Sequence, residues 1–340
     1  MEGTQTREDM MWKARLLAGT LLIAMPAAAT EALSQEAPGK GVTIYMQMGG
    51  NPGDGATLAR QTGATAAAKG LGVDRLNEQF SAWAPEKMIE QFKQALAAKP
   101  SCIVIMGHPG NEAFADLVKQ AVDQGIVVTH GNAPLSELQK TYGPQGFGYA
   151  GVDLYEGGKR TAEEMIKAGN LKNGDKAMVY GVFSQAERGQ SEKGLADTLE
   201  KAGLKVDRLE ITQEANSDAS LAVPVLAAYV QRNPDLKAIG TQHGGITSVL
   251  GDVLKRAGKK PGEVTVGGID LAPATIDGLK SGYVSVTLDQ LLYLQGFIPV
   301  TQCVMSAKYK MPGVSVNTGA GVVTPKTIDA LVPLIEAGIR

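Results

Sequence analysis

The chain has 340 residues, of which 20% are charged, and its formal net charge is −2 at pH 7. A mildly acidic chain without a block of basic residues argues against binding to nucleic acid or to an anionic membrane surface. The three histidines, at positions 108, 130 and 243, are too few and too scattered for a metal-binding motif, so we expect neither a metal nor a cofactor.

The first 29 residues have the pattern of a secretory signal peptide. Lys13 and Arg15 precede an apolar run, 16–25, which Pro26 ends, and the small residues 27–29 follow as a cleavage site. The run is too short for a stable membrane-spanning helix, and no later segment approaches about 20 continuous apolar residues. We therefore expect cleavage near Ala29 and export to the periplasm, with a retained N-terminal anchor as the alternative.

The next 100 residues alternate short β-branched runs with amphipathic stretches. Apolar residues at helical spacing predict helices, and continuous apolar runs predict strands that are covered on both faces. The expected strands are 42–48, 74–80, 102–106 and 126–129, and the expected helices are 54–69, 86–98 and 111–124.

The same rhythm starts again after residues 151–153. The expected helices are 155–167, 184–202, 217–231, 247–257 and 273–280, and the expected strands are 177–182, 206–212, 238–241, 264–268 and 284–288. Strands that alternate with helices predict parallel sheets with right-handed crossovers. The fold class is therefore α/β, built as two similar Rossmann-like lobes, and the boundary near Gly151 has no flexible linker.

Ligands of open α/β sheets bind beyond the carboxyl ends of the strands. The loops at those ends are rich in Asn, Gln, Asp and Arg, and they contain no nucleophile–base pair. If the two sheets face each other, these polar loops meet in one cleft. The two cysteines, Cys102 and Cys303, are far apart in sequence, and we expect buried free thiols, with a single disulfide as the alternative.

Several short segments resemble the periplasmic substrate-binding proteins of the ribose-binding type, which deliver sugars to ABC importers. They are Glu187-Arg188-Gly189, the segment 267–270, the segment 282–290, Asn51-Pro52, and Asp153 followed by two glycines at 157 and 158. The resemblance covers essentially the whole chain after the leader. It implies two lobes joined by three crossovers, with an N-terminal lobe of 38–151 plus about 289–319 and a C-terminal lobe of 152–288 plus about 320–340.

The resemblance also implies ligand-binding roles for particular side chains. Asn51, Arg188, Asp270 and Gln290 match binding residues of the family, and His243 stands where relatives often have Asn. Three positions depart from the family pattern: Asp54 stands near an expected Phe, Asn216 replaces an aromatic residue, and Asn132 stands in place of a charged pair. We include these three among the candidates.

Carboxylates accept hydrogen bonds from hydroxyl groups, a guanidinium donates in a fixed fork, and amides do both. Trp83 and Phe183 are candidates to stack on the apolar face of a sugar ring. Each candidate also has a structural interpretation: Asp270 as a helix cap, His243 as a loop residue, Trp83 as core, and Arg188 as the start of a helix that the Ser184–Glu187 capping box opens.

These observations predict a monomeric, non-enzymatic binding protein that closes on a small sugar or polyol and delivers it to an ABC permease in the inner membrane. One alternative is a binder that presents its ligand to a chemoreceptor or sensor kinase. Another is an exported glycosidase, for which Asp54 and Asp270 are the only candidate carboxylate pair. A repressor of the same fold is excluded by the leader and by the lack of a helix-turn-helix segment.

Overall fold

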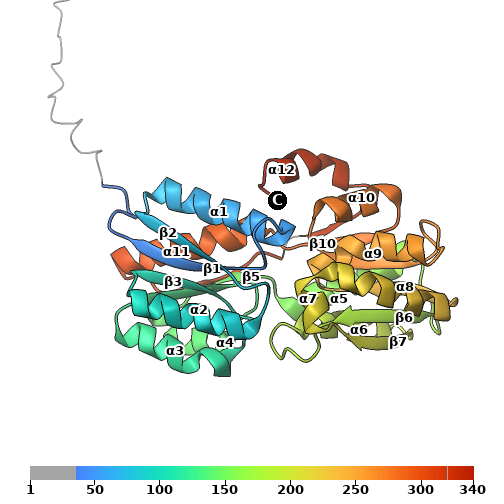
Figure 1. The fold of residues 1–340 in the computed structure, drawn as a ribbon, viewed down its shortest axis with the longest axis horizontal. Coiled ribbons are helices and arrows are strands. Elements are labelled where there is room, and N and C mark those ends of the chain that lie inside the picture. Colours follow the sequence, from blue (N-terminus) through green and yellow to red (C-terminus); the bar gives the residue numbers. More distant parts are fainter. Residues whose placement is uncertain (1–35, 320) are drawn as a thin grey trace, which may run out of the picture. The chain divides into compact units, whose positions relative to one another are not determined.

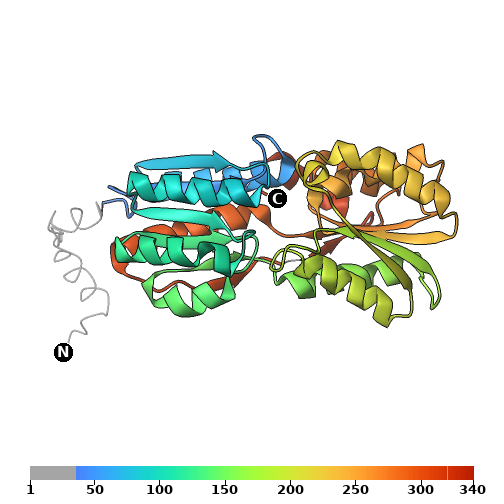
Figure 2. The same cartoon turned by 60° about the horizontal axis from the view of Figure 1, so that its bottom comes forward.

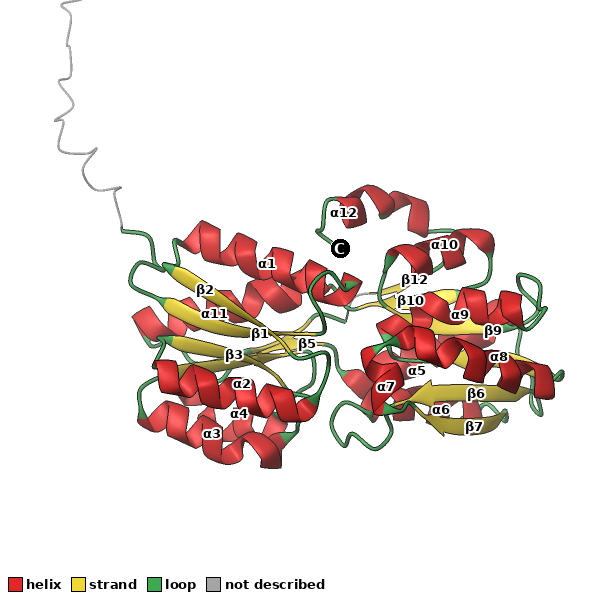
Figure 3. Cartoon of the chain, viewed as in Figure 1, coloured by secondary structure: helices red, strands yellow, loops and turns green. Residues whose placement is uncertain are grey.

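The computed structural model describes residues 36–319 and 321–340, so the leader predicted at 1–29 lies outside the described residues. Strands and helices alternate along the chain, and the helices lie on both faces of two sheets (Figure 1, Figure 3). This is the α/β, two-sheet fold that the sequence pattern predicts.

The first sheet is parallel throughout and has the order β11-β5-β4-β3-β1-β2. Its strands are β1 (Thr43–Gly49), β2 (Arg75–Phe80), β3 (Cys102–Met106), β4 (Val127–Gly131), β5 (Tyr149–Gly151) and β11 (Ser315–Asn317). We call this sheet and its helices lobe 1. The helices are α1 (Gly55–Leu71), α2 (Pro85–Ala98), α3 (Asn111–Asp123), α4 (Ser136–Tyr142) and α11 (Leu292–Tyr309).

The second sheet has the order β12-β10-β9-β8-β6-β7, and only the β10–β12 pair is antiparallel. Its strands are β6 (Lys176–Gly181), β7 (Lys205–Glu210), β8 (Leu236–Gly240), β9 (Thr265–Ile269), β10 (Val286–Asp289) and β12 (Gly321–Val323). We call it lobe 2, with helices α5 (Leu154–Gly169), α6 (Gln190–Lys201), α7 (Gln213–Ser217), α8 (Ala222–Arg232), α9 (Gly244–Arg256), α10 (Pro273–Ser281) and α12 (Val332–Glu336).

The chain passes between the two sheets after β5, after β10 and after β11. The central strands β3 and β4 are buried along their whole length, because helices cover both faces of the sheet (Figure 2). Residues 37–340 form one compact unit. None of the helices in 36–319 and 321–340 has both the length and the apolarity needed to cross a membrane.

Two predicted helices differ from the structure in where they begin or whether they are continuous. The capping box expected at Ser184 does not form, because the Ser184 hydroxyl donates to Glu210 Oε1 at 2.6 Å, and α6 begins at Gln190. The helix expected at 217–231 is divided into α7, a short 3₁₀ turn and α8. Thr212 caps α7, and the Asp218 side chain accepts a hydrogen bond from the backbone N–H of Ser220 at the start of the 3₁₀ turn.

Helices α1 and α11 pack with their backbones in direct contact on one face of the lobe 1 sheet. A Cβ atom at Gly63 would overlap the carbonyl oxygen of Tyr293, and one at Gly296 would overlap that of Arg60. Both glycines are therefore required by the approach of the helices, and no larger residue fits at either position.

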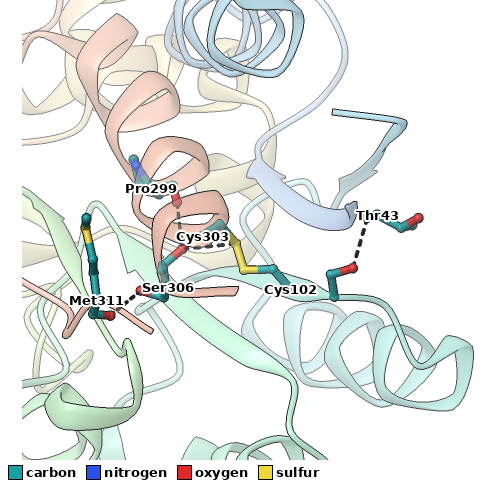
Figure 4. Close-up of a disulfide and its surroundings, with 8 residues drawn as sticks. Thr43, Cys102, Pro299, Cys303, Ser306 and Met311 are labelled. Carbon is teal, nitrogen blue, oxygen red and sulfur yellow. Dashed lines mark hydrogen bonds between the residues drawn. A yellow bond between two sulfur atoms is a disulfide. The ribbon is translucent and has the colours of Figure 1, made fainter. Parts of the chain in front are cut away.

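Cys102 on β3 and Cys303 on α11 form a disulfide within lobe 1 (Figure 4). Their Cα atoms are 5.9 Å apart, inside the usual span of a disulfide, and both residues are fully buried. The expectation of two free thiols is therefore wrong. Their sequence separation of 201 hides a contact that arises only because α11 returns to cover β3.

Candidate ligand-binding site

A cavity of about 310 Å³ lies at the carboxyl ends of strands from both sheets. Its volume is at the lower end of the range for small-molecule sites. Eight of the ten predicted site residues line it: Asp54, Trp83, Asn132, Arg188, Asn216, His243, Asp270 and Gln290. Both lobes and the β10–α11 crossover contribute to this set.

The other two predicted residues do not line the cavity. The backbone N–H of Asn51 donates to Asp54 Oδ2 at 2.7 Å, which orders the β1–α1 loop. Phe183 packs against the lobe 2 core, and the Arg208 guanidinium lies 5.8 Å from its ring centroid. The ring is therefore engaged away from the cavity.

Trp83 is held in the cavity wall by a backbone in an unfavourable conformation. Ala82 and Trp83 both have positive φ, 49° and 59°, which costs free energy for residues with a side chain. The indole packs on Gly49 and Gly50, where a Cβ atom would overlap it. These glycines therefore make room for the tryptophan, and the ring stacks on His108 with centroids 5.4 Å apart.

A chain of hydrogen bonds runs along the cavity wall from lobe 1 to lobe 2. His108 Nε2 lies 2.8 Å from Asn132 Oδ1, and Asn132 Nδ2 donates to Gln295 Oε1 at 3.0 Å and to Gln290 Oε1 at 3.5 Å. Gln290 Nε2 then donates to Asp270 Oδ1 at 2.7 Å. Asp270 therefore orients the crossover amide, and the N-cap of the following helix is Ala272 instead.

Arg188 is fixed within lobe 2 by a buried acid. Its Nη1 donates to Ser191 Oγ at 2.7 Å and to Glu192 Oε2 at 3.0 Å, and its Nη2 donates to the carbonyl of Gln242. Burial raises the pKa of Glu192, and the Arg188 charge opposes that shift. The arrangement holds a guanidinium at the cavity on a rigid turn.

The two cavity histidines are neutral. Burial lowers the pKa of His108 to about 3 and that of His243 to about 4, and the Arg188 charge adds to both shifts. His243 Nδ1 accepts the Ile246 N–H at 3.2 Å as the N-cap of α9, so Nε2 carries the proton that it shares with Asn216 Oδ1 at 2.9 Å. Burial also raises the pKa of Asp270 to about 6.

Arg60 also lines the cavity, and the sequence interpretation missed it. It lies on α1 among small buried residues at helical spacing, which include Thr57, Gly63 and Ala64. An arginine on the buried face of a helix is the signal that would have identified it. Gln185, Gln242 and Ser248, in loops or at helix starts, were missed as well.

Direct contacts between the lobes border the cavity. Asn111 Nδ2 in lobe 1 donates to Glu187 Oε1 in lobe 2 at 2.8 Å. Ser217 Oγ in lobe 2 donates to the Ala82 carbonyl in lobe 1 at 3.2 Å. The structure thus has a closed arrangement, in which the cavity wall is completed by both lobes.

Among the described residues there is no cluster of His, Cys, Asp and Glu that could hold a metal ion.

Comparison with known proteins agrees with this geometry. The chain is 28% identical over 195 residues to the xylose/arabinose-binding protein XylF of Sulfolobus acidocaldarius, covering 55% of this chain and 47% of that protein. It is 30% identical over 214 residues to the D-ribose/D-allose-binding protein of Pseudomonas aeruginosa, covering 60% of each chain. The alignments therefore span about half to three-fifths of these curated relatives.

A solved structure shares the fold over most of its length. The ABC transporter solute-binding protein of Burkholderia graminis, in complex with D-arabinose, superposes with a TM-score of 0.73 at 22% identity, covering 84% of this chain and 96% of that one. The family model described as periplasmic binding protein domain matches residues 51–310. The chain therefore belongs to the periplasmic binding protein domain family.

Proposed function

We propose that this protein binds a small neutral sugar or polyol between its lobes and delivers it unchanged to an ABC permease. The observation that carries the proposal is the closed cavity, in which Arg188, Asp270, Asn132 and Gln290 place donors and acceptors around Trp83. Such a set suits a ring with many hydroxyl groups and one apolar face. The two relatives, a xylose/arabinose-binding protein and a D-ribose/D-allose-binding protein, support the same ligand class.

The contacts of the two cavity carboxylates favour ligand binding over glycoside hydrolysis. A glycosidase needs one carboxyl group as acid and a second as nucleophile or base. Asp54 accepts the Asn51 backbone N–H, and Asp270 accepts from the Gln290 amide, so each carboxylate has a structural partner. The two cavity histidines, His108 and His243, are neutral and hydrogen-bonded. We therefore propose binding without chemistry.

The proposal includes the cellular context. Cleavage of the leader near Ala29 would release a monomeric protein into the periplasm, where the Cys102–Cys303 disulfide is stable. We propose lobe boundaries at 38–151 plus about 289–319 and at 152–288 plus about 320–340. Closure by bending at the crossovers would present one shape to the permease only when ligand is bound.

A thermal-shift panel tests the proposal. The mature protein would be heated with D-ribose, D-allose, D-xylose, D-arabinose, myo-inositol, amino sugars and amino acids. A ligand at about 100 times its Kd stabilises a protein by about 2.7 kcal/mol, so a true ligand raises Tm by several degrees. Binding of an amino acid in preference to every sugar and polyol, or no saturable shift at all, would contradict the proposal.

A further inference from the structure

Arg60 is the largest side chain with no exposed surface in the described part of the chain. Its Nη1 donates to the Met48 carbonyl at the end of β1, at 2.7 Å. Its Nε and Nη2 have no hydrogen-bond partner, and no carboxylate among residues 36–319 and 321–340 lies within ion-pair distance. Buried donors of a charged group without partners are rare, and they call for an explanation in function.

The free atoms of Arg60 lie on one edge of its guanidinium. With Nη1 fixed on Met48, Nε–H and Nη2–H point in parallel and form a fork that fits two oxygens side by side. Burial lowers the pKa of Arg60 only to about 10, so the group remains charged at neutral pH. The guanidinium lies 5.6 Å from the ring centroid of Trp83, whose indole lines the same cavity.

Two kinds of oxygen pair fit this fork: those of an anionic group, a carboxylate or a phosphate, and the hydroxyls of adjacent carbons. The cavity already holds the carboxylates of Asp54 and Asp270, and the charge of Arg188 is engaged by buried Glu192. A ligand carboxylate would lie close to Asp270, which itself interacts electrostatically with Arg60. A neutral diol instead accepts from Arg60 and donates to Asp270.

We propose that Arg60 is a specificity-determining residue whose Nε–H and Nη2–H donate to two oxygens on adjacent carbons of the bound sugar or polyol. The inference rests on the proposed function, and it specifies the part of the ligand that Arg60 recognises, a pair of hydroxyl groups on adjacent carbons. The ligand is then a neutral vicinal diol, with its hydroxyl oxygens on Arg60, and sugar acids are disfavoured by the two cavity carboxylates.

The experiment combines protein and ligand changes in one cycle. Calorimetry would measure the Kd of wild type, Arg60→Met and Arg60→Lys for the tightest sugar of the panel, for each of its monodeoxy forms, and for D-glucuronate and D-galacturonate. A hydrogen bond to a charged group is worth about 1.5–3 kcal/mol, so we expect Arg60→Met to weaken binding by about 10- to 100-fold. Arg60→Lys keeps the charge without the fork, so it restores only part of the affinity.

The deoxy scan separates ligand recognition from a merely structural role of Arg60. Two of the monodeoxy sugars, which lack hydroxyls on adjacent carbons, should bind wild type about 10- to 100-fold more weakly than the parent sugar does. The same two should bind Arg60→Met almost as tightly as the parent sugar binds that variant. Arg208→Met is the control, because Arg208 pairs with Asp197 and Glu200 outside the cavity, and it should bind like wild type.

The possible failures are distinguishable. If Arg60→Met and Arg60→Lys bind the sugar like wild type, or if no deoxy position couples to Arg60, this inference is wrong and the proposed function stands. If wild type prefers a uronate and Arg60→Met loses that preference, the neutral diol is wrong. If wild type binds no neutral sugar or polyol, the proposed function and this inference fail together. Should Arg60→Met not fold, the Arg60→Lys cycle decides alone.

Discussion

Asp270, a proposed ligand-binding residue, shows how a buried carboxylate can cost stability. Its carboxylate is buried, and within residues 36–319 and 321–340 only the Gln290 side chain hydrogen-bonds to it; burial raises its pKa from 3.8 to about 6. An acid with a higher pKa in the folded chain destabilises the fold once it ionises. The cost is absent below about pH 4, grows as the pH rises, and is complete above about pH 6.

We therefore expect Asp270→Asn to stabilise the unliganded protein at pH 7.5 by about 3 kcal/mol, since one pKa unit corresponds to 1.36 kcal/mol. Asparagine keeps an acceptor for Gln290, so the hydrogen bond survives. Calorimetry from pH 4 to 8 should show a Tm difference between variant and wild type that grows with pH. The variant should also bind the sugar more weakly. A Tm difference that does not change with pH would contradict the assignment.

At the same scale, the sequence identified the polar residues that follow strand ends, because parallel strands bring their carboxyl ends to one edge. The family resemblance singled out Asp270, Arg188 and Gln290 among these residues, and the cavity contains all three. Asn51 and Phe183 were predicted to line the cavity and do not. In a loop, a shift of one residue decides whether a side chain faces the cavity, and the sequence does not determine that shift. Arg60 was missed because it lies within a helix, where the loop argument does not apply.

At the scale of elements, helix and strand positions followed from periodicity, whereas the ends of helices depended on partners distant in sequence. Ser184 was expected to cap a helix, but Glu210 on β7 takes its hydroxyl. The three-residue strands β11 and β12 are too short for a periodic signal. The disulfide also depends on partners distant in sequence, because Cys102 and Cys303 meet only when α11 packs on β3.

Removal of the disulfide should destabilise lobe 1 without changing the cavity. Closing so long a loop restricts the unfolded chain, and loss of a native disulfide typically costs about 2–5 kcal/mol. We expect Cys102→Ala/Cys303→Ala to unfold at a lower temperature and to bind the sugar with unchanged Kd, because neither cysteine lines the cavity. Reductant should lower the Tm of wild type and leave that of the double variant unchanged. Equal Tm values for both proteins without reductant would contradict this prediction.

At the scale of the whole unit, the contact from Asn111 to Glu187 joins the two lobes beside the cavity, and we expect it to break when the lobes open. Asn111 Oδ1 also accepts the Leu138 N–H at 3.2 Å within lobe 1. Asn111→Asp keeps that local acceptor but sets a second carboxylate against Glu187. The change therefore acts on closure and spares the fold of lobe 1.

We expect Asn111→Asp to weaken sugar binding by about 5- to 30-fold, since a lost hydrogen bond and a like-charge contact together cost about 1–2 kcal/mol. Small-angle scattering should show that more sugar is needed to reach the closed radius of gyration. Adding Glu187→Gln restores a donor opposite the introduced carboxylate and should recover the affinity to within about 2-fold. Failure of the second change to rescue the first would show that the contact does not control closure.

The close packing of α1 on α11 determines where the molecule can pivot. Because Gly63 and Gly296 lock the two backbones together and the disulfide pins α11 to β3, the helix after the second crossover cannot slide. At this crossover, rotation between the lobes has to be absorbed by the few residues that precede Leu292, while the crossovers after β5 and β11 bend as well. Gln290 is one of them, and it holds the carboxylate of Asp270. We therefore expect torsion at this pivot to displace Gln290, a proposed ligand-binding residue, so that ligand occupancy and lobe rotation are coupled.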